Sequence, residues 1–83
     1  MSKFEKILDK LFRGSSDSNF AFDDLILILK NLGFDFRVKG SHNIFYKEGI
    51  DEIINLQSKS GKAKPYQVRQ VRNILLKYKI VGK

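Results

Sequence analysis

The chain contains no cysteine, and it has one proline, one methionine and one histidine. The absence of cysteine excludes disulfide bonds, thiolate catalysis and cysteine metal sites, so the chain is indifferent to the redox state of its compartment. The longest apolar run, Leu25 to Leu29, is too short to cross a membrane. Charges between Met1 and Phe12 interrupt the apolar stretch that a signal peptide needs. We therefore expect a cytoplasmic protein without membrane association.

Acidic residues are missing from the C-terminal part of the chain. All nine Asp and Glu residues lie at or before Glu52, whereas residues 53–83 hold eight of the sixteen basic residues and no acid. The net charge of +7 is therefore concentrated in one basic block. Nucleic acid is the natural partner of such a block, because neutralising phosphates releases counterions. A solvated basic face that serves only solubility is the alternative.

Length and composition predict one small folded domain, residues 1–83. A chain of 83 residues buries only about 60% of its unfolded surface, so any site must be shallow and open. The 42% apolar and 30% charged content is typical of a folded protein. We expect residues 1–19 to form an N-terminal helix and a flexible loop, and residues 20–83 to form a compact core.

Two helices are predicted in the first part of the chain. Apolar residues at helical spacing place the first helix from Ser2, as its cap, to about Phe12. The polar segment Gly14 to Asn19 follows, so the first helix is expected to be an addition to the compact core. The second helix is predicted from Asp23, as its cap, to about Leu32, and Gly33 suits the left-handed residue that ends a helix.

Three strands joined by short turns follow. Phe34 to Lys39 alternates apolar with polar residues, the period-two pattern of a strand with one face on the core. After the Gly40-Ser41 turn, further strands are expected at His42 to Lys47 and at about Asp51 to Gln57. These three strands form an antiparallel meander.

A final helix is predicted after the polar loop Ser58 to Lys64, from Pro65 to about Tyr78. On helical geometry, Arg69, Arg72 and Lys79 form an exposed basic ridge beside its buried stripe. The order of elements predicts an α+β fold, a three-stranded antiparallel sheet with helices on one face, plus the extra N-terminal helix.

His42 is the residue best suited to proton transfer near neutral pH, and a glycine turn delivers it to the start of a strand. Arg37 and Lys39 share the wet face of the preceding strand, and neighbouring positive charge favours a neutral imidazole that can act as a base. The alternation of its own strand leaves open whether His42 faces the core or emerges at the strand edge. A histidine that only packs is the alternative.

RNA suits a single histidine better than DNA does, because the 2′-hydroxyl is a nucleophile already placed beside the scissile phosphate. DNA hydrolysis would call for a carboxylate-held metal, for which the basic block offers no ligands. We therefore predict RNA cleavage without a metal or cofactor, with His42 as the catalytic residue. The leaving-group proton is left to Lys39, Lys59, Lys62, Tyr46, Tyr66 or water. The residues predicted to bind RNA are Arg37, Lys39, Ser41, Lys59, Lys62, Lys64, Arg69 and Arg72.

The sequence resembles the HicA family of toxins from bacterial and archaeal toxin–antitoxin systems, over about Phe22 to Ile80. The resemblance rests on Leu32-Gly33-Phe34, Arg37, Gly40-Ser41-His42 followed by Ile44-Phe45, and Lys64-Pro65. It implies a double-stranded-RNA-binding-like fold, metal-independent mRNA cleavage that needs the histidine of the Gly-Ser-His motif, here His42, and a HicB-type antitoxin partner. Many relatives carry Pro-x-His on the third strand, where this chain reads Ile54-Asn55-Leu56-Gln57, and many lack the first helix.

Two other functions compete with that of a toxin ribonuclease. A non-catalytic RNA-binding module of the same fold would use the basic block, while His42 packs or contacts a phosphate. A small DNA-binding regulator would insert the last helix into a major groove and read bases with Gln67, Arg69, Gln70 and Arg72. The free toxin is expected to be a monomer.

Overall fold

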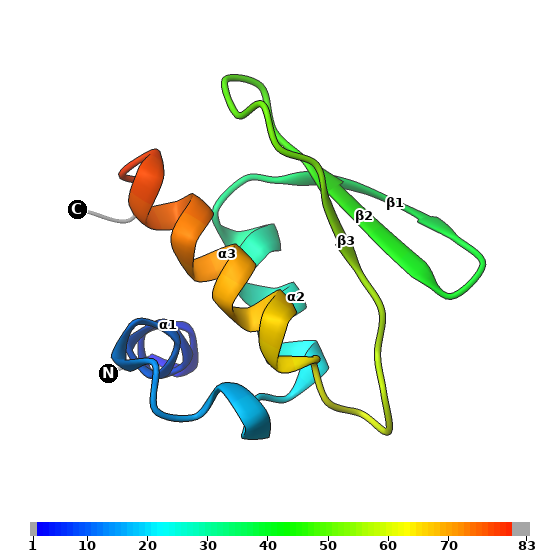
Figure 1. The fold of residues 1–83 in the computed structure, drawn as a ribbon. Coiled ribbons are helices and arrows are strands. Elements are labelled where there is room, and N and C mark those ends of the chain that lie inside the picture. The colour runs from blue at the N-terminus through cyan, green and yellow to red at the C-terminus, as the bar shows by residue number, and fades with distance from the viewer. Residues whose placement is uncertain (1, 81–83) are drawn as a thin grey trace.

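The computed structural model describes residues 2–80, in which three α-helices accompany a three-stranded antiparallel sheet (Figure 1). The elements are α1 (Lys3–Arg13), the 3₁₀ helix η1 (Asp17–Asn19), α2 (Phe22–Asn31), β1 (Asp35–Lys39), β2 (His42–Tyr46), β3 (Ile54–Leu56) and α3 (Pro65–Lys77). The strands lie in the order β1-β2-β3. The predicted α+β fold with its N-terminal helix is confirmed.

The β1–β2 hairpin is as tight as the sequence predicts. Its register places Lys39 opposite His42, so only Gly40 and Ser41 form the turn. Gly40 has a φ of 62°, a left-handed value that glycine adopts without strain at the first central position of a hairpin turn. β2 then pairs with β3, with Phe45 opposite Ile54.

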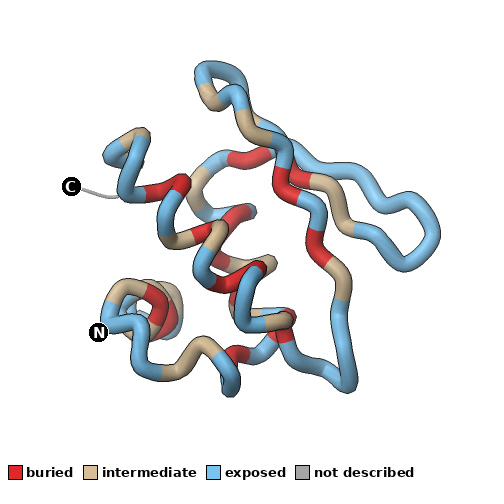
Figure 2. Tube along the Cα trace, in the orientation of Figure 1, coloured by how far each residue is buried: buried red, intermediate tan, exposed pale blue. Residues whose placement is uncertain are grey.

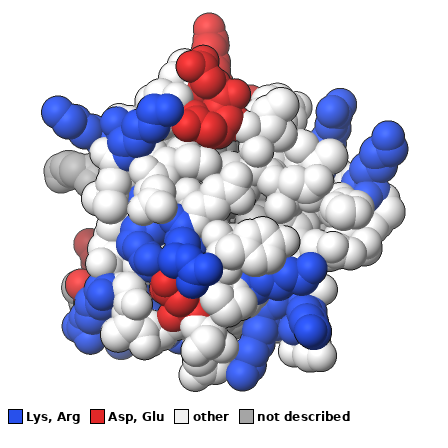
Figure 3. Space-filling model, viewed as in Figure 1, with Lys and Arg blue, Asp and Glu red and all other residues white. Residues whose placement is uncertain are grey.

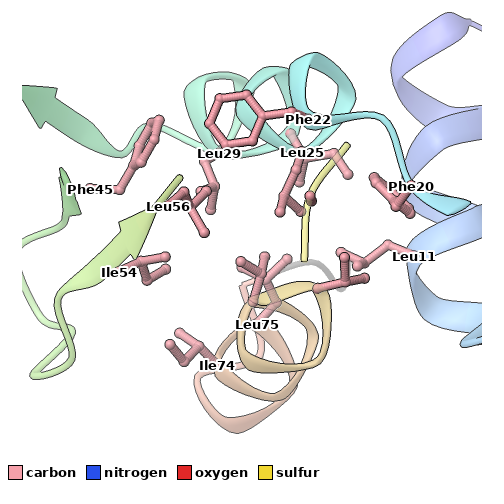
Figure 4. Close-up of a cluster of buried hydrophobic side chains, with 14 of the residues drawn as sticks. Leu11, Phe20, Phe22, Leu25, Leu29, Phe45, Ile54, Leu56, Ile74 and Leu75 are labelled. Atoms are coloured by element: carbon pink, nitrogen blue, oxygen red, sulfur yellow. The ribbon is translucent and has the colours of Figure 1, made fainter. Parts of the chain in front are cut away.

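The core lies between the sheet and the helices (Figure 4). α2 and α3 cover one face of the sheet, and α1 packs on their far side (Figure 1). Phe45 and Leu56 project from the sheet toward Leu29 of α2 and Leu75 of α3, and all four side chains are fully buried. Leu11 of α1 closes the opposite end of this cluster. The helices therefore leave the other face of the sheet open.

The first helix is part of this core and not an addition to it, contrary to the sequence expectation. Ile7 and Leu11 are buried, and each such side chain contributes about 1.5–3 kcal/mol when it leaves water. The Gly14 to Asn19 segment contains η1, whose Asp17 forms an ion pair with Arg72 of α3. The helical spacing of the sequence predicts the buried face of α1, but the partner of that face is set by tertiary contacts.

The start of α2 also differs from the prediction. The helix begins at Phe22 with Ala21 as its N-cap, and no side chain caps it. Asp23 lies inside the first turn, where its negative charge interacts favourably with the helix dipole. The backbone N–H of Phe22 instead donates to the carbonyl of Gly61, so a distant loop fastens the start of this helix. Gly33 has the expected left-handed conformation, with a φ of 88°.

β1 lies at the edge of the sheet and beyond the cover of the helices. The sequence predicts that Phe34, Phe36 and Val38 face the core. Phe34 is buried, but Phe36 and Val38 are 43% and 61% exposed. Figure 2 shows that the turn between β1 and β2 is exposed. Phe36 still stacks on Phe45, with ring centroids 5.5 Å apart, and the ammonium of Lys30 lies 4.4 Å from its ring centroid.

β3 is shorter than predicted and begins at Ile54. Before the strand, Glu52 is bound by the C-terminal end of α3. Its carboxylate accepts hydrogen bonds from Lys77 Nζ at 2.8 Å and from the Tyr78 hydroxyl at 2.6 Å.

None of the helices in residues 2–80 has the length and apolar character that a membrane span requires.

Candidate functional site

His42 lies on the open face of the sheet. Of the two positions that the sequence leaves open, facing the core or emerging into solvent, the structure has the second. Successive side chains of a strand point to opposite faces. Phe45 of β2 points into the core and is fully buried, so His42, Ile44 and Tyr46 point away from the helices. His42 is exposed. An imidazole at this position can therefore reach a ligand from solvent.

Two of the predicted RNA-binding cations share this face. Lys39 is the direct partner of His42 in the ladder, and Arg37 is the direct partner of Ile44. Directly opposed residues of an antiparallel pair project on the same side of the sheet. Both cations are exposed. The structure thus brings together Arg37, Lys39 and His42, as the alternation of the sequence predicts.

Asn55 is a site residue that the sequence prediction missed. It lies opposite Ile44 on β3, between the buried Ile54 and Leu56, so it too projects on the open face. Its Oδ1 lies 2.9 Å from Nδ1 of His42. The signal was present in the sequence as a polar residue between two apolar ones on the neighbouring antiparallel strand. The register that sets Asn55 beside His42 could be read only from the structure.

The turn at Ser41 is fastened to the end of β3. Gln57 donates from Nε2 to the Ser41 hydroxyl oxygen at 3.0 Å. The side-chain amide of Gln67 in α3 faces the backbone of Gln57, and in the orientation that places its nitrogen 3.3 Å from the Gln57 carbonyl and its oxygen 3.1 Å from the Gln57 N–H it satisfies both groups. Gln67 is only 2% exposed. A buried side chain of α3 therefore supports the strand end that contacts the hairpin.

Lys59, Lys62 and Lys64 lie at a second place, in the loop between β3 and α3. All three line one open pocket of about 560 Å³, and Tyr66 forms part of its wall. Figure 3 shows basic side chains gathered over the lower right of the molecule, where Figure 1 places this loop. Asp and Glu gather instead at the top, over the β2–β3 loop. Six of the eight predicted RNA-binding residues therefore fall into two groups: Arg37, Lys39 and Ser41 near His42, and Lys59, Lys62 and Lys64 around this pocket.

The prediction that Arg72 belongs to an exposed basic ridge on α3 is wrong. Its side chain is only 16% exposed, and its guanidinium donates to both carboxylate oxygens of Asp17, at 2.8 and 2.9 Å. A third bond, of 3.1 Å, reaches the carbonyl of Leu11. Helical periodicity places Arg72 beside the buried stripe, but α1 and η1 cover that side of α3. Arg69, by contrast, is exposed.

The DNA-reading surface proposed from the sequence is not formed. It requires Gln67 and Arg72 to be free on the exposed side of α3, whereas Gln67 is buried and Arg72 is paired with Asp17. Base readout in a major groove needs side chains that reach out of the helix. The last helix therefore serves mainly as a core element.

No three His, Asp or Glu side chains between residues 2 and 80 converge as metal ligands. The site consists of an imidazole, an amide, a guanidinium and an ammonium on an open sheet face, together with the separate lysine pocket.

A family model described as the HicA toxin of bacterial toxin–antitoxin systems matches residues 22–78. The matched range contains α2, the whole sheet and α3, and it leaves α1 and η1 outside. Comparison with curated proteins and with solved structures gave no match.

Proposed function

Since the chain belongs to the HicA toxin family and is therefore a toxin of a toxin–antitoxin system, we propose that it is an endoribonuclease that cleaves mRNA. The partner that this family implies is a HicB-type antitoxin. One observation supports the proposal above all others. His42 is exposed beside two cations, and its Nδ1 is engaged by Asn55.

The contact with Asn55 favours one tautomer of the imidazole. Asn55 Oδ1 lies 2.9 Å from Nδ1 of His42, and because an amide oxygen only accepts hydrogen bonds, we propose the tautomer in which Nδ1 carries the proton and Nε2 is unprotonated. Nε2 takes the proton of an RNA 2′-hydroxyl while that oxygen bonds to the adjacent phosphorus. The bond between phosphorus and the 5′-oxygen then breaks. The products are a 2′,3′-cyclic phosphate and a 5′-hydroxyl end.

The cations of the sheet face complete this reaction scheme. Among the groups that could supply the leaving-group proton, Lys39 is the one directly opposite His42 in the strand pairing. Its ammonium donates the proton that the departing 5′-oxygen requires, and the imidazolium returns a proton through solvent. Arg37 neutralises the charge that develops on the phosphorus oxygens. The open face accepts an extended strand without a deep cavity.

The nucleophile belongs to the substrate, so the proposed reaction needs no metal ion or cofactor. Cleavage is expected to continue at an unchanged rate in the presence of EDTA. We also propose that the free toxin is a monomer and that it acts in the cytoplasm, where mRNA is found. Sedimentation of the purified protein tests the first of these two points, and its distribution between cell fractions tests the second.

Replacement of His42 by alanine tests the catalytic assignment. General-base catalysis contributes about 10²- to 10⁴-fold, so His42→Ala is expected to lower the cleavage rate by that factor and to abolish growth arrest. Its thermal unfolding midpoint should equal that of the wild type, because His42 is exposed. Full cleavage and growth arrest by the variant would exclude His42 as the base. Salt-sensitive RNA binding without any cleavage by the wild type would favour the non-catalytic RNA-binding module.

A further inference from the structure

The lysine pocket between β3 and α3 is a feature that the proposed cleavage chemistry does not use. Lys59, Lys62 and Lys64 line it, and none of them forms an ion pair with any residue in the range 2–80. Lysine side chains without counter-charges repel one another when they share a small volume. The pocket is open to solvent, with about 560 Å³ of space, so it can admit a ligand group of nucleotide size.

Two of these lysines are held opposite each other by the backbone. Lys59 and Lys62 exchange two hydrogen bonds, of 2.9 and 3.0 Å, as directly opposed partners of a small antiparallel bridge. Their side chains therefore project on the same side, and like charges in this position are destabilising. The turn between them places both Ser60 and Gly61 in the left-handed region, with φ of 54° and 79°. This conformation is uncommon for serine.

The turn is also fastened to the body of the protein. The carbonyl of Gly61 accepts from the N–H of Phe22, and the N–H of Ala63 donates to the carbonyl of Phe20, at 3.0 and 2.9 Å. Ala63 itself is buried. The backbone of the turn is thus fixed by the fold, and the side chains of Lys59 and Lys62 are exposed at its surface. An anion bound between them would offset the repulsion of their like charges.

Tyr66 indicates which class of anion the pocket suits. Its side chain is 56% exposed and forms part of the pocket wall beside Lys64. An exposed aromatic ring next to cations is the arrangement on which single-stranded nucleic acids stack their bases, at about 1–3 kcal/mol per base. Inorganic anions or acidic side chains would use the lysines but not the ring. A nucleotide of a single strand uses both.

The pocket lies within reach of the strand that His42 would cleave. Lys59 follows Asn55, the hydrogen-bond partner of His42, by four residues. Four residues of extended chain span at most about 14 Å. A single RNA strand can therefore contact both places at once, with different phosphates.

We propose that the pocket of Lys59, Lys62 and Lys64 binds a backbone phosphate of single-stranded RNA away from the scissile linkage, and that Tyr66 stacks on the adjoining base. This inference rests on the proposed function for the identity of the ligand as RNA. It assigns the pocket to substrate binding and not to the chemical step. It also separates the pocket lysines, which belong to the basic block of residues 53–83, from Arg37 and Lys39, which lie beside His42.

Binding of a six-nucleotide oligouridine to the full chain carrying His42→Ala tests the proposal without cleavage. Adding Lys62→Gln is expected to weaken binding about 5- to 10-fold and to reduce the slope of log K against log salt by about 0.7, the value for one phosphate contact of a single strand. Tyr66→Ala should weaken binding by a similar factor, whereas Tyr66→Phe should bind normally because stacking needs only the ring. Lys6→Gln, an equal charge change on the exposed side of α1, is the control and should alter binding less than twofold.

Inorganic pyrophosphate provides a readout that is independent of cleavage. In the wild type it is expected to shift the amide resonances of residues 59–64 and of Tyr66 and to raise the unfolding temperature, and Lys62→Gln should lose both effects. If Lys62→Gln binds oligouridine as well as Lys6→Gln does, the proposal is wrong even where the wild type cleaves RNA. If the wild type binds RNA through Lys62 and Tyr66 but never cleaves it, the pocket assignment stands and the enzymatic function fails. Binding of an acidic peptide in preference to oligouridine would also overturn the proposal, since it would make the pocket a contact for the antitoxin.

Discussion

Arg72 and Asp17 lie 55 positions apart in the sequence and form a two-bond ion pair in the folded protein. The guanidinium also bonds to the carbonyl of Leu11, so one side chain of α3 fastens both η1 and the end of α1. The hydrogen bond from Arg72 lowers the pKa of the Asp17 carboxyl below its ordinary value of 3.8. The same bond raises the pKa of Arg72. The pair attaches the N-terminal segment, which lies outside the matched family range, to the rest of the fold.

Arg72→Gln is therefore expected to destabilise the protein. Loss of hydrogen bonds to a charged partner costs about 1.5–3 kcal/mol when the group left behind is shielded from water, as Asp17 is here. The free energy of unfolding, measured by urea denaturation, should fall by about that amount. Arg69→Gln is the matched control on the same helix, and because Arg69 is exposed it should change the unfolding free energy by less than about 0.5 kcal/mol. Equal effects of the two variants would mean that the ion pair contributes little.

A second prediction concerns Gln67, the buried side chain that holds the end of β3 next to the hairpin turn. Gln67→Met keeps the volume of the buried side chain but leaves the N–H and carbonyl of Gln57 without their partner. An unsatisfied buried polar group costs about 1–3 kcal/mol, so the unfolding free energy should fall by that amount. Hydrogen exchange at the Gln57 amide should become faster than in the wild type. Unchanged exchange at this amide would show that Gln67 does not hold the end of β3.

A third prediction concerns Glu52 and the dependence of stability on pH. The hydrogen bonds from Lys77 and Tyr78 lower the pKa of its carboxyl from an ordinary 4.5 to about 2. A carboxyl with a depressed folded-state pKa contributes stability that is fully present above its unfolded value and is lost as the pH falls through the folded value. The difference in stability between wild type and Glu52→Gln should therefore shrink as the pH is lowered from about 5 to 2. Urea denaturation of both proteins at several pH values measures it, and a difference independent of pH would contradict the assigned pairing.

Local patterns in the sequence were sufficient for most of the fold. The helical spacing of α1, the proline that opens α3 and the glycine turn before His42 each act through the conformation of neighbouring residues, and the structure contains all three elements. The errors have a different origin. Asp23 does not cap α2 because the helix already begins at Phe22, whose N–H bonds to Gly61, a residue far away in sequence. Arg72 is not exposed because the tertiary packing of α1 covers it.

The same distinction applies to the candidate site. The alternation of β1 predicted that Arg37 and Lys39 share one face, and the ladder adds His42 to them. Asn55 was missed because its contact with His42 depends on the register of two strands, which a single-residue shift would reverse. The pocket lysines likewise could not be located from spacing alone, since the place of Lys59 and Lys62 depends on a turn bonded to the start of α2.

Asn55 provides the sharpest test of how His42 is prepared for catalysis. Asn55→Ala removes the acceptor of the Nδ1 proton, so the imidazole loses both its fixed tautomer and its fixed orientation. Cleavage should fall about 10- to 100-fold in kcat with little change in KM, because the amide contacts the base and not the substrate. Nitrogen-15 resonances of His42 should show mainly the Nδ1-protonated form in the wild type and a mixture of tautomers in the variant. Asn55→Gln offers the same amide on a longer chain and should recover part of the rate. A fall in rate with no change in the tautomer signal would contradict this role, because it would mean that Asn55 acts by another route.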